Sequence, residues 1–302
     1  MLVIALIVIH DGWVELQQVR YVVAVAEERS FTRAAQRCFV VQSALSHQVK
    51  ALETELGVRL FARSSRRVEL TDAGERFLPS ARAALEAAER AASEATAAAG
   101  TLRGTLAVGM IPTVTAIDVP VALHRFHDIH PEVRFTLEVL SSDDQEQAVI
   151  EGRLDVGILG LPADHIPRGV ASRALLTEQL VAVLPAAHHE AGRTELCLQE
   201  LAEEQFADFR SGSPGRAQSD QAFSAGGLHR QVVHEATTAD LLLELVSHGL
   251  AVTLLPAGVV PEDPSLAIIP IADGPRRTQH LAWSDFNPRP TARAFVEMVA
   301  KG

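Results

Sequence analysis

The sequence predicts a protein of three successive parts: a small helical domain that ends in a β-hairpin, one long helix, and a larger α/β domain. Three patterns support this division. Apolar residues recur at helical spacing over 15–56, a seven-residue apolar repeat runs over 78–95, and strand-like and helix-like segments alternate over 105–302. With 302 residues, 47% of them hydrophobic and 22% charged, the chain is long enough for two or three folded domains and is not typical of a disordered protein.

Residues 1–14 are expected to form an extension outside the first domain. The apolar run over 1–9 is too short to cross a bilayer, which needs about 20 residues, and no basic segment precedes it. The two cysteines, Cys38 and Cys197, are too few for a disulfide framework. We therefore expect a cytoplasmic protein without a membrane span.

The first domain is expected over 15–73, and its sequence begins with two helices. Apolar residues three and four apart predict a helix over 15–28. Ser30 is a residue type that caps helices, and it predicts a second, short helix that ends near Cys38.

A third helix is predicted from Gln42 to Leu56, because Gly57 is typical of the position that follows a helix. Its expected buried stripe consists of Leu45, Val49, Leu52 and Leu56. Small and polar residues lie away from this stripe, mostly at the N-terminal end: Gln42, Ser43, Ser46, His47 and Lys50. Short donors and acceptors at that end suit base edges in a DNA major groove. An ordinary solvated helix face is the alternative.

Residues 60–71 are predicted to form a β-hairpin that turns at Ser64-Ser65. Arg63, Arg66 and Arg67 lie near the tip of this hairpin. Guanidinium groups in such a position suit contacts with phosphates or with the minor groove. A solvated charge cluster is the simpler alternative.

The run from Glu15 to Gly74 closely resembles the winged helix-turn-helix domain of LysR-type transcriptional regulators. The resemblance rests on four successive segments: SFTRAA (30–35), QSALSHQV (42–49), LETELGVRLFAR (52–63) and RRVELTDAG (66–74). It implies that Thr32 and Arg33 contact DNA together with the residues named above. The family usually has Ser where this chain has Val41 and often has Pro where it has Ser43, so a side-chain cap is missing at Val41.

A helix from Thr71 to about Ala99 is predicted next, with a linker assigned to 74–103 and Pro79 inside the helix. Its apolar repeat includes Leu78, Ala81, Leu85, Ala88 and Ala92. A seven-residue repeat favours a partner helix, and the family resemblance implies an antiparallel dimer. Packing against the chain's own domains is the alternative.

The region over 104–302 is predicted to be an α/β domain. Strand-like runs cover 106–110, 135–139 and 154–159, and helical runs cover 120–129 and 144–151. This order indicates a parallel sheet covered by helices. A second set of strands and helices follows over 180–255, then a strand at 281–283 and a helix over 291–299.

This region resembles the two-lobed effector domain of the same family, which is similar to periplasmic binding proteins. Four loose segments carry the resemblance: GRLDVGI (152–158), LLTEQLVAV (175–183), AFSAGG (222–227) and GLAVTLLP (249–256). It implies a first lobe over 105–177 plus 281–302 and a second over 178–280. The hinges between the lobes are expected near Thr177 and His280.

An effector is expected where strands lead into helices, because helix N-termini there present free N–H groups. The candidate residues are Thr113, Ser141, Ser142, Phe209, Arg210, Ser211, Thr237 and Thr238. Either Arg210 or Arg216 would neutralise an anion. We therefore expect a small, oxygen-rich molecule such as a carboxylate. Helix capping is the alternative role for each hydroxyl.

No cofactor, metal site or catalytic site is expected, so the protein is not predicted to be an enzyme. The sequence has no Gly-x-Ser-x-Gly elbow, no Walker A loop and no Gly-x-Gly-x-x-Gly motif. Two histidine-containing groups invite a metal interpretation: His124, His127 and His130, and His188-His189-Glu190. Neither has the cysteines or the evident convergence of ligands that a structural zinc site needs.

We expect a ligand-responsive transcription regulator, whose homodimer or homotetramer binds a two-fold double-stranded DNA operator and recruits RNA polymerase. A solute-binding or enzymatic α/β protein with an accessory N-terminal domain is the alternative. The net charge of −11 at first argues against a DNA-binding protein. However, residues 15–80 carry +2 and residues 104–302 carry −12. The acidic excess therefore lies outside the part predicted to bind DNA.

Overall fold

The computed structural model describes residues 14–63, 68–98 and 101–301. Their contacts form two compact units, divided between Ala92 and Ser93. None of the helices in these ranges has the length and apolar character that a membrane crossing requires.

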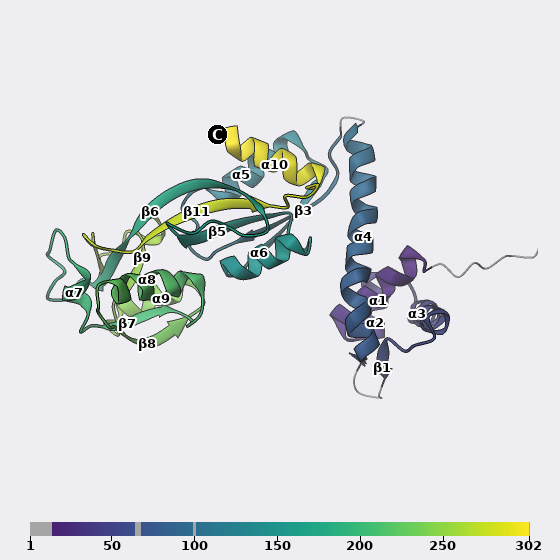
Figure 1. Cartoon of the computed structure of the whole chain (residues 1–302), viewed down its shortest axis with the longest axis horizontal. Coiled ribbons are helices and arrows are strands. Elements are labelled where there is room, and N and C mark those ends of the chain that lie inside the picture. The colour runs from purple at the N-terminus through teal and green to yellow at the C-terminus, as the bar shows by residue number, and fades with distance from the viewer. Residues whose placement is uncertain (1–13, 64–67, 99–100, 302) are drawn as a thin grey trace, which may run out of the picture. The chain divides into compact units, whose positions relative to one another are not determined.

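In the first unit, the predicted helices and hairpin strands all form (Figure 1). Their order is α1 (Leu16–Glu28), α2 (Phe31–Arg37), α3 (Gln42–Leu56), β1 (Phe61–Arg63) and β2 (Val68–Leu70). The strands pair antiparallel, with Phe61 opposite Leu70. This unit is a winged helix-turn-helix, so the first part of the predicted fold is confirmed.

The helix ends of this unit follow from the residues at each position. Ser30 caps α2, because its hydroxyl accepts a hydrogen bond from the N–H of Arg33 at 3.3 Å. Gly57 follows α3 with a φ of 67°, a left-handed conformation that glycine adopts without steric cost. Val41 precedes α3 and supplies no side-chain cap.

One apolar core joins the three helices to the hairpin. Its fully buried members include Val22, Val25, Ala34, Leu45, Val49 and Leu52. The ring of Phe31 meets that of Phe61 edge-on, with centroids 5.7 Å apart. The prediction that Leu56 belongs to the buried stripe is wrong: this side chain is 36% exposed, because α3 ends there and the chain turns away at Gly57.

The long helix α4 (Asp72–Ala98) begins where the sequence predicted and contains Pro79. The hydroxyl of Thr71 accepts a hydrogen bond from the N–H of Gly74 at 3.1 Å and so caps the first turn. Ala81 is only 3% exposed, and Arg82 pairs with Glu27 of α1 at 3.2 Å. The early turns of α4 therefore pack against the chain's own helices.

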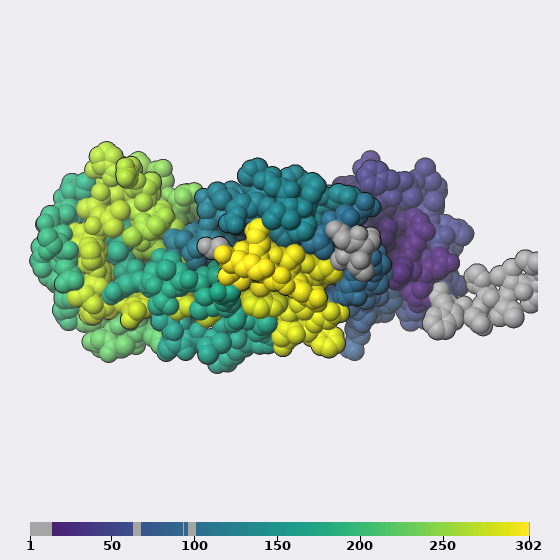
Figure 2. Space-filling model, turned by 90° about the horizontal axis from the view of Figure 1, so that it is seen from above, coloured from purple at the N-terminus to yellow at the C-terminus, as the bar shows by residue number. Residues whose placement is uncertain are grey.

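The second unit begins with a parallel sheet of the predicted kind. Strand β3 (Gly104–Met110) lies between β4 (Val133–Val139) and β5 (Val156–Pro162). Helices α5 (Val119–Ile129) and α10 (Pro290–Lys301) pack on one face, and α6 (Ser142–Ile150) packs on the other. In the space-filling view, the C-terminal segment lies against the teal surface of this first lobe (Figure 2).

Two long strands connect the lobes (Figure 1). They are β6 (Ala171–Pro185) and β11 (Arg276–Trp283), which run antiparallel with Thr177 opposite Thr278. The register shifts between Gln279 and His280. The segments predicted to cross near Thr177 and His280 are therefore neighbouring strands. The sheet is mixed because β11 is antiparallel to both β5 and β6.

The second lobe contains a parallel strand pair and three helices. The strands are β7 (Gln205–Phe209) and β8 (Gln231–Ala236), and the helices are α7 (Leu198–Leu201), α8 (Pro214–Ala225) and α9 (Ala239–Ser247). Strands β9 (Thr253–Pro256) and β10 (Leu266–Ile269) flank the far half of β6, antiparallel to it, and a short 3₁₀ turn, Ala257–Val259, follows β9. The two-lobed α/β architecture is confirmed, although β10 was not predicted.

Candidate functional site

The first candidate surface is the polar face of α3. Gln42, Ser43, His47 and Lys50 are exposed, and Ser46 is half-buried. The stripe of Leu45, Val49 and Leu52 is fully buried, so the polar side chains lie away from the core. The helix thus offers amide, hydroxyl, imidazole and ammonium groups from a rigid support, an arrangement suited to base edges and phosphates.

The two α2 residues differ in their freedom to bind a partner. Thr32 and Arg33 are both exposed. The Arg33 guanidinium, however, lies 3.5 Å from a Glu28 carboxylate oxygen and also donates a hydrogen bond to the Glu28 backbone oxygen. Arg33 can therefore reach a phosphate only by sharing or leaving Glu28.

The hairpin is fastened to α3 by Glu53, which is not among the predicted site residues. One carboxylate oxygen of Glu53 accepts hydrogen bonds from the N–H groups of Leu60 (2.9 Å) and Phe61 (3.1 Å). Arg63 ends β1, whereas Arg66 and Arg67 lie outside the described residues. The start of the hairpin is thus held in a fixed place relative to α3.

The apolar repeat of α4 is only partly available to a second chain. Leu78, Leu85 and Ala88 are half-buried and Ala92 is exposed. Ala81 is already buried by its own chain at 3% exposure. A partner helix can therefore reach every named position of this repeat except Ala81.

The second candidate site is a cavity of about 320 Å³ in the second unit, lined by residues from both lobes. Six of the eight predicted effector residues line it: Thr113, Ser141, Ser142, Phe209, Arg210 and Thr237. Ser211 and Thr238 are not part of the lining; the Thr238 hydroxyl instead caps α9 by accepting a hydrogen bond from the Leu241 N–H at 3.5 Å. A cavity of this size is enough for a small molecule.

Much of the remaining lining is apolar. Ile111, Pro112, Val139, Leu140 and Pro214 contribute carbon surface. The polar lining also includes Asp144, whose carboxylate accepts a hydrogen bond from the Ser141 hydroxyl at 2.7 Å. This mixed lining suits a ligand with an apolar body and polar atoms at one end.

Arg277 is a lining residue that the sequence interpretation missed. It is 4% exposed and donates hydrogen bonds to the hydroxyl and the backbone oxygen of Thr113, both at 2.6 Å. It also pairs with Glu178 at 2.8 Å. Burial lowers the pKa of Arg277, and Glu178 opposes that shift. The strand carrying Arg277 was predicted only from residue 281, so no sequence signal placed this cation in the cleft.

Ser142 and Gln218 join the lobes through one glycine. The Ser142 hydroxyl donates to the Gly160 oxygen (3.1 Å) and accepts from the Gly160 N–H (3.0 Å). Gln218 of α8 donates to the same oxygen at 3.1 Å. A Cβ atom at position 160 would lie 2.6 Å from Cδ1 of Ile111. Ser142 thus has a structural role, and Ser141 caps α6 by accepting from the Asp144 N–H at 3.2 Å.

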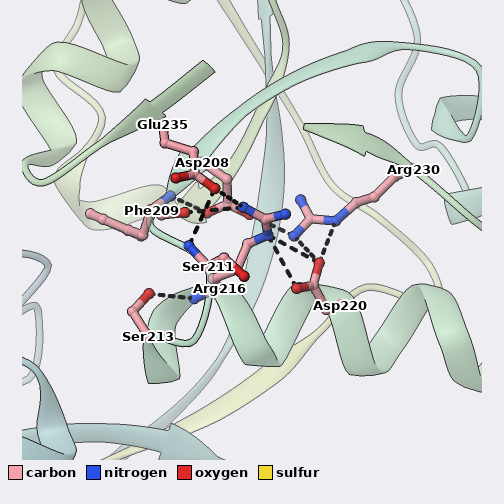
Figure 3. Close-up of polar contacts among 8 residues, drawn as sticks. All are labelled: Asp208, Phe209, Ser211, Ser213, Arg216, Asp220, Arg230 and Glu235. Carbon is pink, nitrogen blue, oxygen red and sulfur yellow. Dashed lines mark hydrogen bonds and ion pairs between the residues drawn. The ribbon is translucent and has the colours of Figure 1, made fainter. Parts of the chain in front are cut away.

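The loop over 209–213 is held by Arg216 and Glu235 (Figure 3). Arg216 donates to the Phe209 backbone oxygen (3.3 Å) and to the Glu235 carboxylate (3.1 Å), while the Ser211 N–H donates to that same carboxylate at 3.3 Å. Arg216 also pairs with Asp220 at 3.1 Å. Arg216 is therefore engaged in supporting the loop, unlike the exposed guanidinium of Arg210, which pairs with no carboxylate among the described residues.

A buried ion pair supports the strand that leads into this loop (Figure 3). Arg230 and Asp208 lie 2.6 Å apart, and both side chains are at most 3% exposed. Arg230 also lies over the rings of Phe206 (5.2 Å) and Phe223 (5.5 Å). Burial raises the pKa of Asp208, and Arg230 opposes that shift. This pair fixes the end of β7 beside the cavity.

Comparison with protein families matches both units. Residues 16–75 match the model described as bacterial regulatory helix-turn-helix protein, lysR family, and residues 99–302 match the LysR substrate binding domain. The Hca operon transcriptional activator HcaR of Escherichia coli is 33% identical over 94% of this chain and 97% of its own length. The transcriptional regulator AlsR of Bacillus subtilis is 31% identical over 80% of both chains.

Solved structures show the same architecture. Full-length CbnR complexed with its target DNA has a TM-score of 0.71 at 26% identity and covers 95% of this chain and 99% of its own. A full-length, singly substituted OxyR from Pseudomonas aeruginosa has a TM-score of 0.72 at 28% identity and covers 96% and 94% respectively.

Proposed function

Because this chain belongs to the LysR family of bacterial transcriptional regulators, we propose how its parts divide the work of a ligand-responsive regulator. Residues 15–73 bind an operator, 74–103 pair two chains, and 104–302 bind a small effector. The relatives are transcriptional regulators, and the alternative of a solute-binding or enzymatic protein is not favoured. Such a protein acts where the DNA is, in the bacterial cytoplasm.

The observation that carries the proposed DNA interface is the exposed polar face of a helix whose opposite face is fully buried. In this interface α3 enters a major groove. The contacting residues are Gln42, Ser43, Ser46, His47 and Lys50, flanked by Thr32 and Arg33. The hairpin arginines Arg63, Arg66 and Arg67 contact phosphates or the minor groove.

We propose that two chains pair through the part of α4 that remains open. Leu85, Ala88 and Ala92 form the central contact, and Leu78 adds to it at the edge. Because Ala81 is already buried by its own chain, it packs beneath this interface and does not touch the partner. Dimers, or pairs of dimers, then meet a two-fold operator.

The proposed effector has an apolar body and one anionic group. The apolar lining fits the body, while Arg210 and the hydroxyls of Thr113 and Thr237 fit the anion. Arg277 is balanced by Glu178 and already donates hydrogen bonds to Glu178 and Thr113, so it orders the site rather than supplying a free positive charge. An effector that binds one lobe arrangement more tightly shifts the population toward that arrangement. The change reaches the DNA-bound pair and alters recruitment of RNA polymerase.

The DNA interface is tested with DNA from the region upstream of the gene that encodes this chain. A footprint locates the operator, and a competition binding assay compares operator with random DNA. Replacing Gln42 and Ser46 together by Ala should remove the preference for operator over random DNA and leave weak, salt-sensitive binding to both. Thr54→Ala is the matched control, because its hydroxyl only donates to the Lys50 backbone oxygen in the last turns of α3. If the double variant keeps its operator preference, α3 is not the recognition helix.

A further inference from the structure

Two histidines and a glutamate converge in the second lobe, away from the proposed effector site. One ligand atom from each of His188, His189 and Glu204 lies within 4.8 Å of the others. None of the three lines the effector cavity. The effector cavity therefore does not explain why these three side chains lie together.

The fold brings these residues together through two anchored turns. After β6 ends at Pro185, the His188 N–H donates to the Pro185 oxygen (2.9 Å), which reverses the chain. Glu204 follows α7, where its N–H donates to the Leu201 oxygen at 3.0 Å, and Leu201 is fully buried. Both turns thus start from the core of the lobe.

The three side chains form a half-open set. His188 Nε2 lies 3.3 Å from Glu204 Oε1, and these side chains are 12% and 26% exposed. The His189 ring stacks on that of His188 with centroids 4.4 Å apart, and it is 72% exposed. Two ligands are therefore held by the protein, and the third can rotate.

The surroundings favour a cation. Glu190 lies 3.6 Å from His189 Nε2 and also pairs with Arg193 at 3.2 Å. Arg193 additionally pairs with Glu200 at 2.9 Å. Glu190 and Glu200 thus share one guanidinium, and Glu204 beside His188 adds a third carboxylate, which leaves negative charge near the histidines.

We propose that His188, His189 and Glu204 bind one divalent transition-metal ion, with water completing its coordination. Imidazole and carboxylate ligands suit Zn²⁺ and Ni²⁺. Ligands at about 2.0–2.2 Å from zinc lie roughly 3–4 Å from one another, so a rotation of His189 closes the set. The sequence singles out His188 and His189 but not the third ligand, because Glu204 comes from another segment.

Metal binding has one local consequence. His188 Nδ1 accepts a hydrogen bond from the Glu190 N–H at 3.2 Å, so the neutral ring carries its proton on Nε2. Ligation through Nε2 moves that proton to Nδ1 and releases the Glu190 amide. The amide of Glu190 should then exchange faster with solvent in the metal-bound protein.

The test is calorimetric titration of zinc sulfate into the tag-free full chain after chelator treatment. We expect one ion per chain, and His188→Gln, His189→Gln and Glu204→Gln should each weaken binding by about tenfold or more. His248→Gln is the matched control in the same lobe. His248 pairs with Glu244 at 3.9 Å on α9 and belongs to no three-ligand group among the described residues. This variant should bind zinc like the wild type.

Two results would overturn the proposal. Absence of saturable zinc binding by the wild type would leave His188 and Glu204 as a close polar pair only. Equal binding by wild type and Glu204→Gln, with circular dichroism showing both folded, would do the same, because Glu204→Gln keeps the shape of the side chain and removes its charge.

Discussion

At the residue scale, a side chain can bind a ligand only if its polar atoms are not already bonded to neighbouring residues. Ser142 and Arg216 are residue types that bind anions, yet both are occupied by neighbours, Ser142 by Gly160 and Arg216 by Glu235. Arg277 was not predicted, because a lone arginine in an unpredicted strand gives no sequence signal. Residue type and position in the chain thus located the cavity, since six of the eight predicted residues line it, but not which groups remain free.

Gly74 is the residue whose replacement the structure opposes most directly. A Cβ atom there would lie 2.2 Å from the backbone oxygen of Leu60, which cannot move without displacing the hairpin. We expect Gly74→Ala to destabilise the first unit by about 1–3 kcal/mol, as overpacking usually does. Urea unfolding followed by an operator-binding assay measures both effects.

Ser80→Ala is the control for this prediction, because Ser80 is exposed on the same helix. Its effect on unfolding should stay within about 0.5 kcal/mol. A Gly74→Ala protein as stable as the Ser80→Ala protein would show that the hairpin adjusts without cost.

At the element scale, periodicity predicted helices well and the connecting strands poorly. α3 and α9 lie where the sequence placed them, because apolar spacing agrees there with Gly57 after α3 and with the Thr238 cap before α9. The first half of β6 is exposed or half-buried and mixes polar with apolar residues, so it lacks the apolar run that marked its second half. Its strand structure comes from pairing with β11, a long-range contact that local sequence does not encode.

The loop over 209–213 is the element on which the effector site depends most. Replacing Arg216 by Gln removes its charged hydrogen bonds to the Phe209 oxygen and to Glu235. Because Glu235 is 45% exposed, solvent screens this pair, and we expect a loss of about 1 kcal/mol in local stability. Hydrogen exchange of the Ser211 amide, which donates to Glu235, should accelerate about fivefold.

Arg193→Gln is the matched control, since Arg193 also pairs with two carboxylates in the second lobe, Glu190 and Glu200, and neither belongs to the 209–213 loop or its supports. Exchange at Ser211 should not change in that variant. If the exchange of the Ser211 amide is also unchanged in Arg216→Gln, the loop keeps its structure without the hydrogen bonds of Arg216.

At the scale of the whole molecule, the uneven charge matches the proposed division of work. The slightly basic first part carries the helix proposed to read DNA, and the acidic remainder surrounds the effector cavity. The order of parts and the two-lobed architecture were predictable, because family motifs recur in sequence order. Contacts between chains were not predictable, since they depend on which apolar residues of α4 stay exposed in the folded chain.

We propose that ligand in the cleft and operator on the first unit affect each other's binding. The most direct measurement is a footprint of the full chain on its upstream DNA, with and without a metabolite that raises its melting temperature. We predict a changed pattern of protection, and an equal and reciprocal change in ligand affinity when DNA is present. An unchanged footprint and unchanged affinity, for a ligand whose binding Arg210→Ala abolishes, would contradict the coupling.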